Sequence, residues 1–373
     1  MILSDVCEFI VDCPHSTAPD EGEGYPLIRT PNVGKGRLDL NGVHRVSESV
    51  YKQRIQRGAP RANDLIFARE APAGNVALVQ ENQTVCLGQR TVLIRPNVQK
   101  VNPQYLVYYL LSPKPQYELL GTANGATVAH VNLPAIRNLK IELPEKSVQD
   151  KIGTILVTYD DLIENNQKQI KLLEEAAQRF YKEWFLDMRF PGHENTKIVD
   201  GVPEGWSRGL LQELIDVNYG KDHKKAPDDG NIPVYGSGGL MRKCNKSLFS
   251  GEAVLIPRKG SLNNIMYVDE IFWTVDTMFY ATMKQPHTAV FVYFFVKAFD
   301  MYSMNIGAAV PSMTAKILDA MDVVIPDKET LEKFDKRAKT YFNKIKTLQG
   351  QNERLKTARD LLLPKLMSGE VEV

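Results

Sequence analysis

Basic side chains in this chain of 373 residues gather in short segments that also contain glycine. Ammonium and guanidinium groups hold phosphate oxygens, guanidinium groups also bridge O6 and N7 of guanine, and an asparagine amide pairs with N6 and N7 of adenine. Basic loops beside glycine and asparagine therefore suit duplex DNA. The four segments are "GKGR" (34–37), "RIQRGAPR" (54–61), "GKDHKK" (220–225) and "MRKCNK" (241–246).

The residues predicted to contact DNA come from these segments and from the ends of two predicted strands. A single charged loop is more often simply exposed to solvent than part of a binding site. For each of these residues, solvent exposure without a binding role therefore stays open as the alternative. The predicted residues are Lys35, Arg37, Arg57, Arg61, Arg69, Lys221, Lys224, Lys225, Arg242, Lys243, Arg258 and Lys259.

The total charge neither favours nor excludes an anionic partner. The chain has 46 basic and 45 acidic residues, which gives a formal net charge of +1. A neutral total can conceal basic loops where the acidic residues lie elsewhere. Here the acidic residues concentrate in two long helical stretches.

Composition favours an ordinary globular protein that stays inside the cell. With 43% apolar and 24% charged residues, a chain of this length suits two domains. The start, "MILSDVCEFIVDCPHS", has no basic region and no cleavage site of small residues, so it is not a secretory signal. The longest apolar run, "TAVFVYFFVKAF" (288–299), is too short to span a bilayer. A cytoplasmic location is therefore predicted.

The sequence predicts no catalytic residue and no metal site. GxxxxGK[ST] and GxSxG are both absent, and the six histidines show no metal-binding spacing. The cysteines form no CxxC pair, so free thiols are preferred over zinc. These cysteines are Cys7, Cys13, Cys86 and Cys244.

Two fragments resemble catalytic motifs but have plainer explanations. "NPQY" (102–105) is one residue away from the NPPY box of adenine methyltransferases, yet Asn102 should cap a helix with Pro103 in its first turn. "PDKETLEK" (326–333) suggests nuclease carboxylates, but its counterpart "PEKSVQDK" (144–151) also starts a helix. Capping by acidic residues of the first turn explains both.

The elements that must position the basic loops occur twice in the chain. "TANGATVAHVNLPAIRNLKIELP" (122–144) matches "MNIGAAVPSMTAKILDAMDVVIP" (304–326) without a gap. Gly125 aligns with Gly307, an offset of 182 (307 − 125). A gapless match of this length indicates duplication. The same offset pairs Ala126 with Ala308, Val128 with Val310 and Pro144 with Pro326.

The regions ahead of these segments also correspond. Residues 64–79 match residues 253–268, with Arg69 opposite Arg258 and Asn75 opposite Asn264, and both read as hairpins. Short buried helices are predicted at 102–112 and 288–298. The intervening loops differ in sequence, so the two halves resemble two recognition domains that bind two different targets. Whether the two arginines contact phosphate or pair with a nearby carboxylate is left open.

A long heptad-like stretch follows each repeated segment. Apolar or small residues recur at alternating steps of three and four from Leu331 to Leu366, with polar Asn352 and Arg359 on the same line, as a coiled-coil seam requires. From Val148 to Trp184 the same spacing passes through Leu162 and has one extra step of four near Asn166, which resembles a stutter. Each helix would span about 36 residues, or roughly 54 Å, and Pro364 should stop or kink the second. Internal antiparallel pairing is a simpler prediction than a homodimer zipper. Asn166 and Asn352 either set the register of the pair or are solvated.

Aromatic residues crowd the end of the first long helix beyond what a seam needs. This excess predicts an apolar surface for another subunit. The alternative is that the rings pack on the neighbouring domain. The residues are Phe180, Tyr181, Trp184 and Phe185.

Three stretches resemble the DNA specificity subunits of type I restriction-modification systems. They are "RFYKEWFLDMRFPG" (179–192) with "VPEGW" (202–206), the paired "ELP" and "VIP" before the helices, and the ending "RDLLLPKLMSGEVEV" (359–373). The resemblance covers nearly the whole chain. In one departure from the family pattern, no PEGW-like turn precedes the first half.

The resemblance implies an α+β fold with an internal pseudo-two-fold repeat. Two mixed α/β target recognition domains with short twisted sheets, residues 1–146 and 188–327, would alternate with helical segments 147–187 and 328–373. The helical segments would pair as an antiparallel coiled coil, and the second includes the C-terminal tail.

The resemblance also implies a noncatalytic subunit, each half of which reads one half of a bipartite asymmetric duplex target. Two modification subunits would supply adenine-N6 methyltransferase activity with S-adenosylmethionine, and restriction subunits would use ATP and Mg. No cofactor is expected in this chain. The alternative is a coiled-coil scaffold for protein ligands, and sequence-specific, salt-dependent duplex binding would separate the two.

Overall fold

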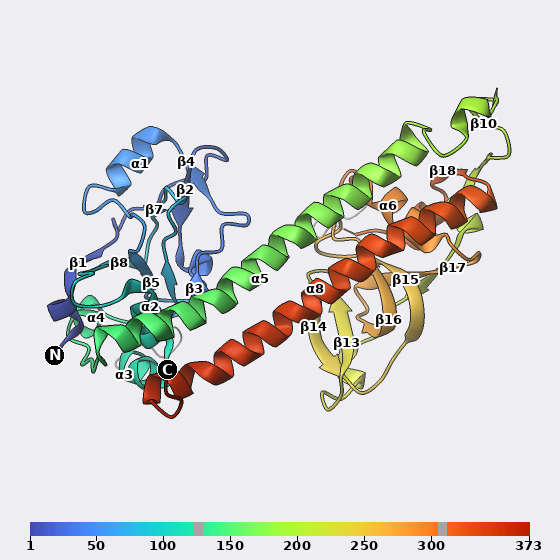
Figure 1. Ribbon diagram of the computed structural model, residues 1–373. Helices are drawn as coiled ribbons and strands as arrows, with labels where there is room; N and C mark the ends of the chain where they lie inside the picture. Colours follow the sequence, from blue (N-terminus) through green and yellow to red (C-terminus); the bar gives the residue numbers. More distant parts are fainter. Residues whose placement is uncertain (122–129, 305–311) are drawn as a thin grey trace. The chain divides into compact units, whose positions relative to one another are not determined.

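The computed structural model of the protein describes residues 1–121, 130–304 and 312–373. The chain divides into two compact units: unit 1 comprises residues 1–167 and 349–373, and unit 2 comprises residues 168–348. Each unit contains a part of each of the two long helices, drawn in green and red in Figure 1. Among the described residues, no helix is long and apolar enough to cross a membrane.

Unit 1 has a five-stranded sheet of order β1-β8-β5-β6-β3 and a three-stranded sheet of order β4-β2-β7. Both sheets are mixed, since β3 pairs with β6 and β2 with β7 in parallel while the other pairs are antiparallel. The strands are β1 (Cys7–Asp12), β2 (Tyr25–Ile28), β3 (Gly36–Arg37), β4 (Arg45–Val46), β5 (Leu65–Ala68), β6 (Val76–Leu78), β7 (Cys86–Leu87) and β8 (Thr91–Pro96).

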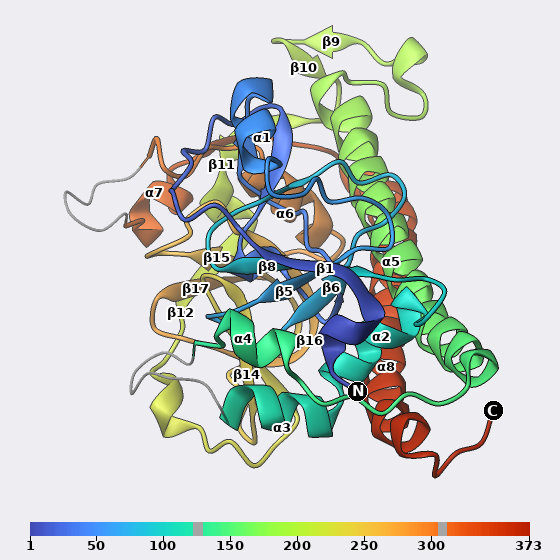
Figure 2. The ribbon, with the colours of Figure 1, turned by 90° about the vertical axis from the view of Figure 1, so that its left-hand side faces the viewer.

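The central strand of unit 1 is buried on both faces. Leu65 and Phe67 of β5 join a core that contains α2, whereas Ile66 and Ala68 join a second core on the opposite face. Successive side chains of a strand point to opposite faces, so a continuous apolar run fills two cores. Figure 2 shows the strands of this sheet near α2. The helices of this region are α1 (Glu48–Arg54), α2 (Pro103–Leu111), α3 (Pro113–Gly121) and α4 (Leu133–Arg137).

Unit 2 has a six-stranded mixed sheet of order β12-β17-β15-β16-β13-β14 and two small two-stranded sheets, β10-β9 and β11-β18. Its central strand β15 again divides its side chains between two cores, with Val254 and Ile256 on one side and Ala253 and Leu255 on the other. The strands are β9 (Ile198–Val199), β10 (Val202–Pro203), β11 (Ser207–Leu210), β12 (Ile215–Tyr219), β13 (Ile232–Gly236), β14 (Gly239–Cys244), β15 (Phe249–Pro257), β16 (Met266–Thr274), β17 (Met278–Met283) and β18 (Asp322–Ile325).

The repeat predicted from the sequence is present in the order and bounds of the elements. Short helix α7 (Ala315–Asp319) is displaced from α4 by the same offset at both ends (315 − 133 and 319 − 137), and the starts of the long helices differ by it too (328 − 146). The predicted hairpins are β5-β6 and β15-β16, both antiparallel. The predicted buried helices are α2 and α6 (Ala289–Lys297). The matches of Gly125 with Gly307, Ala126 with Ala308 and Val128 with Val310 lie outside the described residues.

The long helices are α5 (Lys146–Tyr181), which a π turn extends to Leu186, and α8 (Lys328–Ser368). Within unit 1 they pair in antiparallel fashion. Asn166 of α5 contacts Asn352 of α8, and Asp160 of α5 contacts Arg359 of α8. The second contact lies earlier on α5 but later on α8, so the two helices run in opposite directions. The predicted antiparallel pair is therefore confirmed.

Helix α8 continues through Pro364 to Ser368, so Pro364 does not stop the helix, and a kink at Pro364 stays a prediction. One predicted seam position was wrong: Leu162 is 45% exposed, and Ile163, at 7% exposure, takes the buried position. Earlier turns of α5 pack into the core of unit 1 through Ile152 and Leu156, so the buried face of the helix is wider than a heptad seam.

A single carboxylate caps α8. Asp327 accepts hydrogen bonds from the Thr330 backbone N–H at 2.9 Å and from the Trp206 indole N–H at 3.0 Å. Burial alone would raise the pKa of Asp327, but the hydrogen bonds from Thr330 and Trp206 outweigh burial and lower it. Trp206 belongs to the "VPEGW" turn, so this turn is held at the start of the second long helix. The predicted acidic capping was wrong for α5, since no acidic residue lies in its first turn and Glu145 accepts from Val148 and Gln149 through its backbone carbonyl.

Candidate nucleic-acid interface

Arg69 and Arg258 occupy the same backbone position in the two halves. Each follows a central strand, β5 or β15. Their N–H groups donate to Arg90 and Thr277, the residues just before β8 and β17, at 2.9 and 3.0 Å. Their carbonyl oxygens accept from the N–H groups of Val131 and Met313, which the offset of the repeat relates (313 − 131), at 3.0 and 2.9 Å. The two halves therefore share one hydrogen-bonded framework at this point.

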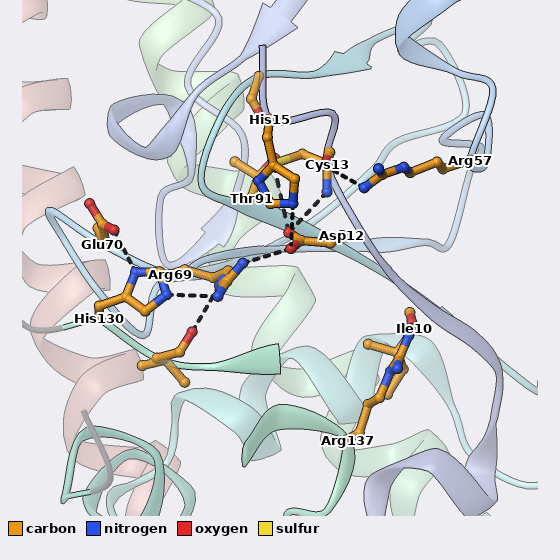
Figure 3. A network of polar contacts seen from close by, with 12 residues as sticks. Ile10, Asp12, Cys13, His15, Arg57, Arg69, Glu70, Thr91, His130 and Arg137 are labelled. Carbon is orange, nitrogen blue, oxygen red and sulfur yellow. Dashed lines mark hydrogen bonds and ion pairs between the residues drawn. The ribbon is translucent and has the colours of Figure 1, made fainter. Parts of the chain in front are cut away.

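The Arg69 side chain is buried in a polar network and does not face solvent. Its guanidinium donates to Asp12 Oδ2 at 2.8 Å and to the Val131 carbonyl at 2.8 Å, and lies 2.7 Å from His130 Nε2 (Figure 3). His130 also contacts the Glu70 carboxylate. Arg69 is 8% exposed. Of the two alternatives left open by the sequence, the structure shows for Arg69 the pairing with a nearby carboxylate.

The second half places different chemistry on the same framework. The match of Arg69 with Arg258 aligns the next residues too, so Lys259 corresponds to Glu70 (259 − 70 equals 258 − 69). The offset that relates Val131 to Met313 likewise aligns Ser312 with His130 (312 − 130). Lys259 and Ser312 form a β-bridge. Arg258 is half-buried over the rings of Tyr219 and Phe279, at 5.2 and 5.5 Å from their centroids.

A pair of equivalent asparagines holds the loops that differ between the halves. The Asn75 amide donates to the Val33 carbonyl at 2.8 Å, and the Asn264 amide donates to the Ser237 carbonyl at 2.8 Å. Val33 directly precedes the glycine-rich turn "GKGR" of the first half, and Ser237 is the first residue of the turn "SGG" of the second. A shared side chain thus fixes the base of each loop, while the exposed residues of the loop are free to differ.

The remaining predicted arginines are held by partners inside the protein. Arg37 pairs with Asp161, and Arg61 with Glu8 at 3.2 Å. Arg57 donates to the Cys13 carbonyl at 3.0 Å. Arg242 pairs with Asp228 and donates to the Ala226 carbonyl at 2.8 Å, so it ties the 223–228 segment to β14.

The predicted lysines differ from the arginines. All are exposed, and across residues 1–121, 130–304 and 312–373 no partner holds their ammonium groups. An exposed ammonium group on a flexible side chain can contact a phosphate oxygen from many directions, because it acts as a point charge. These residues are Lys35 in unit 1 and Lys221, Lys224, Lys225, Lys243 and Lys259 in unit 2.

The aromatic residues predicted to face a partner subunit form part of the core of unit 2. Phe180 stacks on Phe334 with ring centroids 5.0 Å apart, and Phe185 meets the same ring edge-on at 4.7 Å. Packing on the neighbouring domain, the alternative interpretation, accounts for the crowding. Their exposures are 7% for Phe180, 4% for Tyr181, 6% for Trp184 and 8% for Phe185.

The coiled-coil asparagines lie together. The Asn166 amide donates to the Asn352 carbonyl oxygen at 2.9 Å, and the residues are 8% and 5% exposed. The solvated alternative is therefore excluded. A paired polar group at one seam position suits a register role.

Several polar residues that organise this region were not predicted from the sequence. Asp12, His130, Asp160 and Asp161 were not singled out, because their partners are distant in the chain. "NPQY" was interpreted correctly, since Asn102 caps α2 by accepting from the Tyr105 N–H at 3.0 Å. Within the described part of the chain, no group of three or more His, Cys, Asp or Glu residues could hold a metal ion.

Comparisons with known proteins point to one family. The model of the "Type I restriction modification DNA specificity domain" matches residues 1–175 and 203–357. The chain is similar to the type I restriction enzyme MjaIX specificity subunit of Methanocaldococcus jannaschii, with 26% identity over 89% of this chain and 83% of the relative. The HindI specificity subunit of Haemophilus influenzae is 22% identical over 84% and 87%.

The fold has a counterpart among solved structures. The crystal structure of a type I restriction-modification S subunit from M. genitalium has a TM-score of 0.60, with 18% identity over 98% of this chain and 95% of that chain. The duplicated framework, the divergent basic loops and the antiparallel helices agree with the match of the family model. The chain belongs to the family of type I restriction-modification DNA specificity domains, and it is a noncatalytic specificity subunit of such a system.

Proposed function

We propose that each half of the chain reads one half of a bipartite, asymmetric duplex target. Residues 1–146 and 188–327 act as the two target recognition domains, and residues 147–187 and 328–373 connect them. The observation that carries this proposal is a common framework, Arg69 with Val131 and Arg258 with Met313, that supports loops of different sequence. A duplicated scaffold with divergent loops suits two different half-sites.

Within each domain we assign phosphate contact to the exposed lysines. The arginines are mostly committed to carboxylates and carbonyls of the protein, whereas the lysine ammonium groups are free to replace counterions. Base readout belongs to the glycine-rich turns that Asn75 and Asn264 hold, because these turns differ between the halves.

The bound complex would position catalytic partners on the target. Two modification subunits would supply adenine-N6 methyltransferase activity and bind S-adenosylmethionine, and restriction subunits would use ATP and Mg. The support is membership of the family of specificity domains.

The test is methylation sequencing. The chain is co-expressed with the modification subunits of its own system in a host without adenine methylation, on a plasmid library with randomised inserts. We expect methylated adenines in one split motif with two fixed half-sites and a constant gap. Methylation in a continuous motif, or in none, would contradict the proposal.

A further inference from the structure

The turn that contains Lys35 is tightly constrained on both sides. The Gly34 N–H donates to the Arg37 carbonyl at 3.1 Å, and Val33 bridges Leu38. Gly36 and Arg37 form strand β3, which pairs with β6. Lys35 therefore lies exposed at the tip, and its direction depends on where Gly36 and Arg37 are held.

Gly36 packs directly against helix α5. Its φ of +91° favours glycine, and a Cβ at this position would lie 2.5 Å from Asp160 Oδ2 and 3.2 Å from the Tyr108 ring. The Arg37 guanidinium pairs with the carboxylate of the next residue on the helix, Asp161. Both residues that follow Lys35 thus contact two consecutive acidic residues of α5.

Asp160 is itself held by side chains from two other elements, α2 and α8. Its side chain is 2% exposed, and it accepts a hydrogen bond from the Tyr108 hydroxyl of α2 at 2.5 Å. It also pairs with Arg359 of α8. Burial raises the pKa of Tyr108, so this hydroxyl remains a donor. Removing two charges from water is unfavourable, so a buried pair of this kind is better explained by the geometry it sets than by stability.

Lys35 and Arg359 also line one hollow of about 210 Å³ in unit 1, together with Tyr108 and Asp360. The tip of the turn therefore shares a surface with the second long helix.

The glycine-rich turn of the second half has no such link. A Cβ at Gly236 would meet Met241 and Val275, and one at Gly260 would meet Ser237, all of them outside the long helices. Within unit 2, the sheet contacts α8 through an ion pair of 2.8 Å between Lys339 of α8 and Glu252 of β15. In the part of the chain that is described, only the first turn contacts acidic residues of α5.

We propose that Asp160 and Asp161 of α5, with Arg359 of α8, are positioning residues for the DNA-reading turn at Lys35. The helix pair then takes part in the specificity for one half-site and not for the other. This inference rests on the proposed function. It adds a role in base recognition to helices that would otherwise only connect the two recognition domains.

The test compares variants in the library assay for methylation, with the modification subunits present. Asp161→Asn removes the charge that holds Arg37, and Asp161→Glu keeps it. Gly36→Ala places a methyl group against Asp160. Glu174→Gln is a matched control, an exposed acidic residue on the same helix. Gly22→Ala controls for backbone strain, because Gly22 has a φ of +77° and no atom within 4 Å of its Cβ position.

We expect Asp161→Asn and Gly36→Ala to lower base discrimination in one half-site about tenfold, the size of one lost base contact. The other half-site should be unchanged, and Asp161→Glu should stay within about twofold of the wild type. Lys35→Ala removes a phosphate contact, so it should weaken methylation of all targets about equally and leave base discrimination in both half-sites unchanged. Thermal unfolding of each variant checks that the protein is folded.

Three results separate the ways in which the inference can fail. Unchanged discrimination in both half-sites for folded Asp161→Asn and Gly36→Ala overturns the inference. An equal loss in both half-sites shows a general structural role and also overturns it. A wild-type protein that directs no bipartite methylation refutes the proposed function instead, whatever the variants do.

Discussion

The buried pair of Asn166 and Asn352 should set the register of the two long helices. Replacing Asn352 by Leu leaves the Asn166 amide buried without its partner, which should cost about 1–3 kcal/mol of unfolding free energy. Replacing both by Leu removes both polar groups and should recover most of that loss. Chemical denaturation of the four proteins in this double-mutant cycle measures the coupling. A single variant as stable as the wild type would contradict a role for the pair.

Arg69 and Lys243 should behave differently although both were predicted to bind DNA. Arg69→Ala leaves the half-buried Asp12 carboxylate and the Val131 carbonyl without their guanidinium donor, so it should destabilise the protein by about 1–3 kcal/mol. Lys243 is exposed and unpaired within the described residues, so Lys243→Ala should leave stability unchanged and lower the salt slope of DNA binding by about one.

Binding titrations between low and moderate salt, with thermal unfolding in parallel, measure both quantities. A normal salt slope for Lys243→Ala would remove this residue from the interface. An altered slope for folded Arg69→Ala would mean that the buried network opens when DNA binds.

At the scale of elements, the cap of α8 should depend on pH. Asp327→Ala removes a helix cap and should cost about 0.5–2 kcal/mol at pH 7. Since hydrogen bonds hold the folded pKa below its ordinary value of 3.8, the contribution is full above about pH 4 and is lost as the pH falls through the folded pKa. Denaturation of the wild type and the variant from pH 7 to pH 3 should show their difference shrinking. A difference that stays constant to pH 3 would show that the carboxylate charge is irrelevant.

The end of α5 is a core element, so its rings should matter to the free protein. Trp184→Ala should cost about 3–5 kcal/mol, because Trp184 is 6% exposed and packs on Phe180. Leu186→Ala in the same turn is the control, since Leu186 is 57% exposed and should change stability by less than about 0.5 kcal/mol. Thermal unfolding compares them. A stable Trp184→Ala protein that fails only to assemble with its partners would favour the partner role instead.

At the scale of the whole molecule, the helices should govern the gap between half-sites. Seven residues inserted after Leu162 of α5 and seven after Leu355 of α8 fall at facing points. Both insertions lie between the Asp160–Arg359 and Asn166–Asn352 contacts, and both contacts survive. The added heptad lengthens each helix by about 10 Å. At about 3.4 Å per base pair, the gap should widen by roughly three base pairs.

Methylation sequencing of the double insertion should show the wider gap with both half-site sequences unchanged, because the turn at Lys35 keeps its contacts with Asp160 and Asp161. An insertion in one helix alone should lower stability before it changes the gap. An unaltered gap in the double insertion would refute the idea that the helices set the distance.

Much of the fold could be predicted because its determinants are local. Apolar spacing of three and four predicts a long helix wherever it recurs, and alternation broken by Gly and Asn predicts a hairpin. The offset of the repeat, seen in the letters alone, reappears in the bounds of α4 and α7 and in the starts of α5 and α8. The cap at Asn102 was predictable for the same reason, since a cap depends on a few adjacent residues.

The sequence by itself therefore determined the duplication, the antiparallel helix pair and the family, whereas the burial of Asn166 against Asn352 was decided by the fold. Only the tertiary structure decided which cations are free, because a charge is neutralised by whatever the fold brings beside it. Arg69 meets Asp12 across 57 residues, Arg37 meets Asp161 across 124, and Arg359 meets Asp160 across 199. No periodicity connects such positions, so neither the burial of Arg69 nor the contact between a DNA-reading turn and α5 could be derived from spacing along the chain.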